Sequence, residues 1–448
     1  MSGSSQPNIL LVMADDQGWG DTSYNGHPEL KTPNLDALAR SGLRFDRFYA
    51  GHFDCSPTRG SVMTGRYPAR YGVFAPGLPI RPQELTIAKV LQSAGYATGH
   101  FGKWHLNGNS GAKTGEGSGK PILADDPLSP GKLGFDEWVS ACNYFDLDPA
   151  LGRNGVPERF HGDGSDVVTD EALKFIRRKV KEGKPFLSVV WFGSPHEPHR
   201  ALPADRAAYA SLPEEDQNYY GELAAVDRSI GRLRAALREL NIADNTLLWY
   251  CSDNGGSAGP KSTGYLRGMK GTLWEGGLRV PGIVEWPSRI SKPFVTQMPC
   301  STLDIYPTVL EATGVAASNQ VQPLDGISLL PLFDRKTETR SKPLSFWEHS
   351  PGPGVQHGHA VLLDWPYKLH TDPTLARRVG KRVRKQAGSE TLPAVLLYDV
   401  SKDPKETSDL AAQEPERVKR MTATLKAWKE SVDRSLSGTD YPSSAKAN

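Results

Sequence analysis

Cysteine is scarce in this sequence, and long runs of apolar residues are missing. The four cysteines, Cys55, Cys142, Cys251 and Cys300, are spread over 448 residues, which is too few for the disulfide framework of a small secreted domain. The longest apolar stretches are about the length of one buried strand, so no membrane-spanning helix is expected. A chain of this length has ample residues for a large hydrophobic core.

Neither basic nor acidic residues are in clear excess. Lys and Arg number 53 against 51 Asp and Glu, which gives a formal net charge of +2. Such a balance creates no overall field that would attract a nucleic acid, so no nucleic-acid partner is expected. An anionic ligand would have to be bound by a local group of cationic side chains.

The opening residues, Met-Ser-Gly-Ser-Ser-Gln-Pro, lack the basic and apolar regions of a signal peptide. We therefore expect a cytoplasmic protein if Met1 is the native start. If a signal peptide was removed, we expect a periplasmic or secreted one.

Apolar runs alternate with amphipathic stretches through residues 1–340. The runs that we interpret as strands cover residues 8–14, 96–101, 185–192 and 246–251. The stretches with helical spacing cover residues 32–42, 84–94, 167–181 and 217–240. This alternation predicts an α/β domain with a mainly parallel sheet flanked by helices. Residues 107–166 are rich in Gly, Pro and Asp, and we interpret them as a long loop at the rim of a functional site.

The pattern changes at residues 335–343, which are polar and charged. Shorter apolar runs follow at residues 344–347, 359–364, 367–370 and 395–400, and a final helical stretch covers residues 414–436. This order predicts a small antiparallel sheet with one covering helix. We therefore divide the chain into a large domain of residues 1–340 and a small C-terminal α+β subdomain of residues 341–448.

Two pairs of polar residues directly follow predicted strands. Asp15 and Asp16 end the first strand, and Asp253 and Asn254 come after the strand of residues 246–251. If these strands are neighbours, the four side chains converge at the carboxyl edge of the sheet. Carboxylates packed together need a cation, and a set of oxygen ligands favours Ca²⁺, or less strongly Mg²⁺, over zinc. The alternative is that each pair is a solvated acidic loop end.

The stretch from Cys55 to Gly65, Cys-Ser-Pro-Thr-Arg-Gly-Ser-Val-Met-Thr-Gly, resembles the signature of the type I sulfatases, of the arylsulfatase and N-acetylgalactosamine-6-sulfatase kind. The resemblance implies an alkaline-phosphatase-like fold. It also implies that a formylglycine-generating enzyme oxidises Cys55 to formylglycine, an aldehyde whose hydrate attacks a sulfate ester. The second hydroxyl of the hydrate then allows sulfate to be expelled. The alternative is an ordinary loop cysteine before a helix that starts with proline.

The same resemblance assigns further residues to the site. It implies one Ca²⁺ held by Asp15, Asp16, Asp253, Asn254 and residue 55. Arg59 would brace the formylglycine. In Gly-Lys-Trp-His-Leu, Lys103 would bind sulfate and residue 55, and His105 would take the proton that releases sulfate. His196 matches the histidine that meets the leaving-group oxygen, and Lys270 matches a second sulfate-binding lysine.

Other polar residues carry weaker signals. For His199, His161 and Arg159, an ordinary surface position is favoured over contact with substrate. The basic run from Arg377 to Lys385 is either a solvated loop or, as we hypothesise, a docking site for a polyanionic sulfated glycan.

Taken together, these residues predict a sulfuric ester hydrolase, with residues 1–340 as its catalytic domain. A sulfated carbohydrate is favoured over an aryl sulfate as its substrate, because the 107–166 loop and the basic run suggest a broad cleft. One alternative is a phosphomonoester or phosphonate monoester hydrolase on the same scaffold. The other is a catalytically silent anion-binding relative in which Cys55 remains a thiol.

Overall fold

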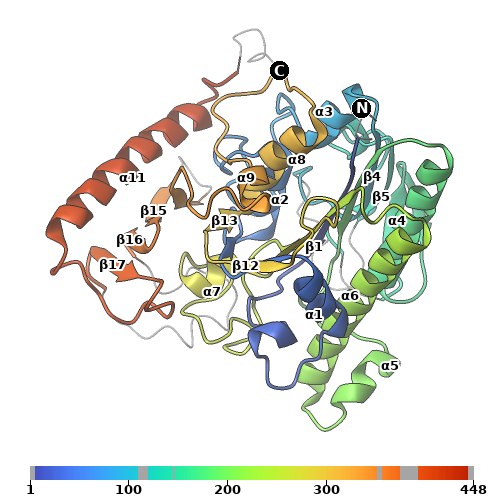
Figure 1. The fold of residues 1–448 in the computed structure, drawn as a ribbon, viewed down its shortest axis with the longest axis horizontal. Helices are drawn as coiled ribbons and strands as arrows, with labels where there is room; N and C mark the ends of the chain where they lie inside the picture. The colour runs from blue at the N-terminus through green and yellow to red at the C-terminus, as the bar shows by residue number, and fades with distance from the viewer. Residues whose placement is uncertain (1–5, 109–119, 145–146, 351–355, 374–391, 442–448) are drawn as a thin grey trace.

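The computed structural model describes residues 6–108, 120–144, 147–350, 356–373 and 392–441. Its main element is a ten-stranded sheet in the order β12-β2-β11-β9-β1-β8-β4-β5-β6-β7 (Figure 1). Strands β9, β1, β8, β4 and β5 in its middle run parallel, while antiparallel pairs lie on either side. The strands are β1 (Asn8–Ala14), β2 (Leu43–Phe45), β4 (Ala97–Lys103), β5 (Glu137–Ala141), β6 (Ala150–Arg153), β7 (Val156–Arg159), β8 (Phe186–Trp191), β9 (Thr246–Ser252), β11 (Gly282–Glu285) and β12 (Phe294–Thr296). The predicted mixed, mainly parallel sheet is therefore confirmed.

Helices cover both faces of this sheet. In β1, Ile9, Leu11 and Met13 join the core on one face, whereas Leu10 and Val12 join the core on the other. The second face is covered by α1, α4 and α6, and α4 and α6 pack side by side (Figure 1). The helices of this part are α1 (Pro33–Ser41), α2 (Cys55–Thr64), α3 (Ile87–Ser93), α4 (Gly164–Lys181), α5 (Pro203–Arg206), α6 (Glu214–Glu239), α7 (Glu275–Leu278), α8 (Ile305–Thr313) and α9 (Leu330–Phe333). Burial on both faces explains why the central strands are continuous apolar runs.

One predicted helix is shorter than its apolar spacing suggests. Helix α3 begins at Ile87 rather than at residue 84, because the Thr86 hydroxyl accepts a hydrogen bond from the backbone N–H of Lys89 and caps the helix. Glu84 lies before this cap, and its carboxylate pairs with the guanidinium of Arg66.

The interpretation of residues 107–166 as a loop is wrong for the segment that forms β5, β6 and β7. These strands extend the large sheet beyond β4. The β6–β7 hairpin turns at Asn154 and Gly155, which both have positive φ angles, 49° and 93°. Asn-Gly is a strong signal for a tight hairpin, and it could have revealed these strands. The apolar pattern of β7 is weak because every residue of this edge strand is exposed.

A four-stranded antiparallel sheet forms the C-terminal part, as predicted. Its order is β14 (Leu344–Ser350), β15 (Gln356–Asp364), β16 (Tyr367–Thr371) and β17 (Val395–Asp399), and helix α11 (Pro415–Leu436) lies against it (Figure 1). Leu344 and Phe346 share a hydrophobic core with Tyr49 and Trp274 of the larger part. This core contains residues from both sides of residue 340, so the domain boundary there stays a prediction. A third, small sheet has the order β10-β3-β13, from β3 (Phe48–Tyr49), β10 (Arg279–Val280) and β13 (Cys300–Ser301).

None of the helices in the described part of the chain combines the length and the apolar character that crossing a membrane requires.

Candidate active site

The two acidic pairs meet where β1 and β9 end. These strands are parallel neighbours, with Ala14 opposite Ser252, so the residues that follow them lie side by side. The backbone N–H of Asp16 donates to Asp253 Oδ1 at 3.1 Å, and Asn254 Nδ2 donates to Asp16 Oδ1 at 2.8 Å. All four side chains, including that of Asp15, are buried. The structure therefore places together the oxygen ligands that the sequence predicts.

This cluster has the donors that a cation would need. One ligand atom each from Asp15, Cys55 and Asp253 lie within 4.8 Å of one another. Asp15 Oδ1 and Asn254 Oδ1 are buried and have no hydrogen-bond donor among the described residues. Burial, together with repulsion from Asp15, raises the pKa of Asp253 to about 7. A hard cation would satisfy the orphaned oxygens and offset this repulsion, so the residues fit such an ion.

Cys55 lies at the start of helix α2, next to this cluster. Its side chain is buried, and its Sγ is 3.3 Å from His105 Nδ1. Burial raises the pKa of the thiol to about 11, although the ammonium groups of Lys103 and Lys270 act in the opposite direction. An unmodified Cys55 is thus a neutral thiol near pH 7 and a poor nucleophile.

Arg59 lies one turn further along α2 and connects three parts of the site. Its Nε and Nη2 atoms donate to Asp253 Oδ2 at 3.0 and 2.6 Å, and its Nη1 donates to the carbonyl of Lys103 at 3.1 Å. The guanidinium also lies 5.2 Å from the centre of the Trp191 ring. Since the side chain is fully buried, Arg59 fixes Asp253 relative to helix α2.

Lys103 is the last residue of β4, the third parallel strand that contributes to the site, and His105 lies two residues beyond it. Lys103 Nζ donates to Asp15 Oδ2. Burial would raise the pKa of Asp15, but Lys103 and other cations hold it below its ordinary value. His105 has a φ of 55°, and burial plus the charges of Lys103 and Arg59 keep its pKa well below the ordinary histidine value. His105 is therefore neutral near pH 7.

His196 and Lys270 both lie next to Asp16. Lys270 Nζ is 2.6 Å from Asp16 Oδ1. Burial lowers the pKa of Lys270, but the Asp16 carboxylate outweighs it and raises that pKa. His196 follows β8; its Nε2 is 3.8 Å from Asp16 Oδ2, and its Nδ1 donates to the Glu197 carbonyl at 2.7 Å. Burial and Lys270 lower the pKa of His196 to about 4, so its ring is neutral near pH 7.

The C-terminal sheet supports the segment that carries Lys270. Glu406 accepts a hydrogen bond from the backbone N–H of Glu275 at 2.7 Å, and its carbonyl accepts one from Arg267 Nη1 at 2.7 Å. Lys368 Nζ lies 3.0 Å from a carboxylate oxygen of both Glu275 and Glu406. The segment of residues 267–275 is thus fixed on both sides of Lys270, a connection that the sequence did not reveal.

The weaker candidates differ in their surroundings. The His161 side chain is 84% exposed and pairs with Asp148 at 3.5 Å, and Arg159 belongs to the exposed strand β7. The ring of His199 packs against Tyr219, with centroids 4.8 Å apart. The basic run from Arg377 to Lys385 lies outside the described residues.

Sequence reasoning missed one further contact of the acidic cluster. The hydroxyl of Ser257 donates to Asp16 Oδ2 at 3.4 Å. The only signal for it is the position of Ser257 in the stretch Asp-Asn-Gly-Gly-Ser that follows β9.

Comparison with known proteins agrees with this geometry. An alignment over 372 residues is 32% identical to N-acetylgalactosamine-6-sulfatase of Canis lupus familiaris and covers 72% of this chain but 65% of that protein, slightly less than two thirds of its length. Arylsulfatase A of Homo sapiens is 30% identical over 448 residues, which cover 90% of this chain and 83% of that protein.

Among solved structures, that of Ps i-CgsB in complex with k-i-k-neocarrahexaose superposes with a TM-score of 0.80 at 27% identity and covers 95% of this chain and 93% of that one. A profile of the sulfatase family matches residues 7–315, more than half of the chain. The fold is thus that of the alkaline-phosphatase-like enzymes, and this chain belongs to the sulfatase family, whose members are sulfuric ester hydrolases.

Proposed function

We propose that this protein hydrolyses sulfate monoesters of a carbohydrate, with formylglycine formed from Cys55 as its nucleophile and one bound Ca²⁺. The observation that carries the proposal is the position of residue 55 beside a buried carboxylate cluster that is paired with three cationic side chains. Lys103, Lys270 and Arg59 are all fixed by ion pairs to the carboxylates of this cluster. A negatively charged ester needs such a preorganised cationic surrounding.

Asp15, Asp16, Asp253, Asn254 and residue 55 would hold the Ca²⁺. When bound, the ion supplies a Lewis acid for a sulfate oxygen and favours the ionised form of a hydroxyl beside it. The aldehyde hydrate supplies a nucleophilic oxygen that Cys55 lacks as a neutral thiol.

The other residues of the site have separate roles in binding the ester and transferring protons. Lys103 and Lys270 bind the sulfate oxygens, and Arg59 keeps Asp253 in place beside residue 55. His105 is neutral and 3.3 Å from the Cys55 sulfur, which suits a base that takes a proton from residue 55. His196 needs to gain a proton before it can donate one to the leaving oxygen, and the negative charge of a bound ester favours that proton.

A carbohydrate substrate is supported by two of the similar proteins. One is named as a sulfatase of N-acetylgalactosamine 6-sulfate, and the other was solved with an oligosaccharide bound.

The reaction type is tested by comparing kcat/KM on 4-nitrophenyl sulfate and 4-nitrophenyl phosphate. We expect the sulfate ester to be preferred by at least about 10-fold, because this chain belongs to the sulfatase family and a phosphate monoester carries more negative charge than a sulfate monoester. A clear preference for the phosphate would favour a phosphomonoester hydrolase instead. Activity on sulfated N-acetylgalactosamine oligosaccharides, measured by release of sulfate, then tests the substrate class.

Removal of the metal should abolish this activity. Dialysis against EGTA is expected to lower kcat by at least about 10²-fold, because the Lewis acid is lost while three carboxylates are left together. Ca²⁺ should restore activity more fully than Mg²⁺, which binds few all-protein sites. Full activity in protein shown by elemental analysis to be free of metal would contradict the proposed ion.

Replacing Glu406 should weaken catalysis from a distance. In E406Q the bonds that hold the segment around Lys270 are altered, and a small misplacement of a sulfate-binding group is expected to cost about 10-fold in kcat/KM. Glu414 offers a matched control, because its exposed carboxylate pairs only with Arg417 among the described residues. Equal activity of E406Q and E414Q would show that the C-terminal sheet does not position Lys270.

A further inference from the structure

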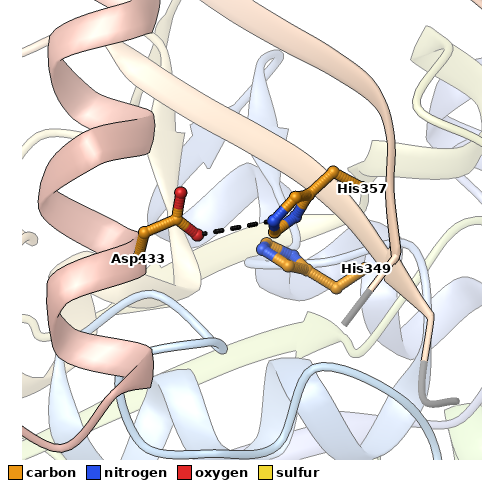
Figure 2. Close-up of side chains that lie close together, drawn as sticks. All are labelled: His349, His357 and Asp433. Carbon is orange, nitrogen blue, oxygen red and sulfur yellow. Dashed lines mark ion pairs between the residues drawn. The ribbon is translucent and has the colours of Figure 1, made fainter. Parts of the chain in front are cut away.

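A second group of potential metal ligands lies in the C-terminal part and shares no residue with the acidic cluster. His349 comes from β14, His357 from β15 and Asp433 from α11, and one ligand atom of each lies within 4.8 Å of the others. His357 Nε2 is 3.7 Å from Asp433 Oδ1. Figure 2 shows both imidazole rings facing the carboxylate of Asp433. Three separate elements thus bring their donors to one point.

The two rings are held in orientations that suit coordination. His349 Nδ1 lies 3.1 Å from the carbonyl of Trp347. Since a carbonyl only accepts, Nδ1 carries the proton and the lone pair of the neutral ring is on Nε2. Histidine ligands of metals commonly make this bond with their other nitrogen. The ring of His357 stacks on Trp347, with centroids 4.3 Å apart and an interplanar angle of 23°.

The position of Asp433 is fixed by the packing of its helix. Met421, Leu425 and Val432 of α11 pack in one hydrophobic core with Trp347 and other residues of the sheet. Asp433 directly follows Val432, so the apolar contacts that seat α11 also determine where this carboxylate lies. The packing of the helix therefore fixes the position of the Asp433 carboxylate.

We propose that His349, His357 and Asp433 bind one Zn²⁺ ion that ties α11 to the β14–β15 pair. Two imidazoles and one carboxylate are typical zinc ligands, whereas Ca²⁺ and Mg²⁺ prefer oxygen alone. Tetrahedral coordination at about 2.1 Å requires donors about 3.4 Å apart, close to the observed 3.7 Å between His357 and Asp433. The side chains of these two are 41% and 46% exposed, so an ion can reach them from solvent.

One neighbouring charge opposes binding. Lys429 precedes Asp433 by one helical turn, and its Nζ lies 4.8 Å from the centre of the Trp347 ring. This ammonium repels a cation, so K429M is expected to bind Zn²⁺ more tightly than the unaltered protein.

The test is a calorimetric titration of the Ca²⁺-saturated protein with Zn²⁺. We expect one Zn²⁺ per chain, with affinity lowered at least about 10-fold in H357Q and D433N. The His161–Asp148 pair provides a matched control: a surface histidine and aspartate 3.5 Å apart that belong to no three-residue cluster among the described residues. H161Q should bind Zn²⁺ like the unaltered protein.

Thermal unfolding tests independently whether a bound ion stabilises the contact between α11 and the sheet. Zn²⁺ should raise the Tm of the unaltered protein and of H161Q, but not that of H357Q, because an ion that binds only the folded state stabilises it. The absence of Zn²⁺ binding at this site, or equal binding by H357Q and H161Q, would overturn the proposal. So would Zn²⁺ that binds only by displacing Ca²⁺, because the ion would then occupy the acidic cluster.

Discussion

C55A is expected to lose at least about 10⁴-fold in kcat on an aryl sulfate, because it removes the group from which the nucleophile is made. The residual rate would come from the cations and the metal site, which still bind the ester. Alanine fits the space of the buried cysteine side chain, so circular dichroism and the Tm should change little.

C300A provides the control for this substitution. Cys300 is also buried, and its thiol donates to the Met298 carbonyl at 3.4 Å, in the small β10-β3-β13 sheet. Its replacement should leave kcat within about twofold, because this hydrogen bond links Cys300 to Met298 and, among the described residues, to no residue of the site. A C55A protein with more than a tenth of the unaltered activity would show that the nucleophile is another group.

R59M is expected to destabilise the fold by about 3–5 kcal/mol, because it leaves the Asp253 carboxylate buried without its partner. Both side chains of this ion pair are fully buried, with an Nη2–Oδ2 distance of 2.6 Å. The pair also joins helix α2, which carries residue 55, to the end of β9. Activity should therefore fall by at least about 10²-fold even where the protein remains folded.

The measurement is the free energy of unfolding in urea for R59M beside R232M. Arg232 pairs with Asp166 on the surface, where the two side chains are 36% and 27% exposed, so R232M should cost less than about 1 kcal/mol. Similar losses in both variants would mean that the Arg59–Asp253 pair contributes no more than a surface pair. Addition of Ca²⁺ to R59M should recover part of the stability, since the ion also offsets the charge of Asp253.

The core of the site could be predicted because parallel strands align their carboxyl ends. Asp15 and Asp253 are far apart in sequence, yet each directly follows an apolar run, and this alone places them together once the runs are neighbours. Lys103, His105 and His196 also lie at the carboxyl ends of parallel strands, β4 and β8, whereas Lys270 lies in a turn far along the chain from any such strand end. Their assignment came from resemblance to a family, and the structure places all four around the acidic cluster.

Other features depend on tertiary contacts that leave little trace in the sequence. Glu406 and Glu275 meet only because the C-terminal sheet packs against the larger part, and no spacing links them. His349, His357 and Asp433 form no recognisable ligand motif, because two come from neighbouring strands and the third from a distant helix. The strands β5 to β7 were missed for another reason: all three are short, and every residue of the edge strand β7 is exposed.

The most direct test of the proposed mechanism is mass spectrometry of the tryptic peptide of residues 48–59, from protein made in its native host. Conversion of Cys55 to formylglycine makes this peptide about 18 Da lighter, and a hydrazide reagent should trap the aldehyde. We expect the lighter, trappable peptide in active protein and its absence in C55A. An unmodified thiol in protein with full sulfatase activity would contradict the account.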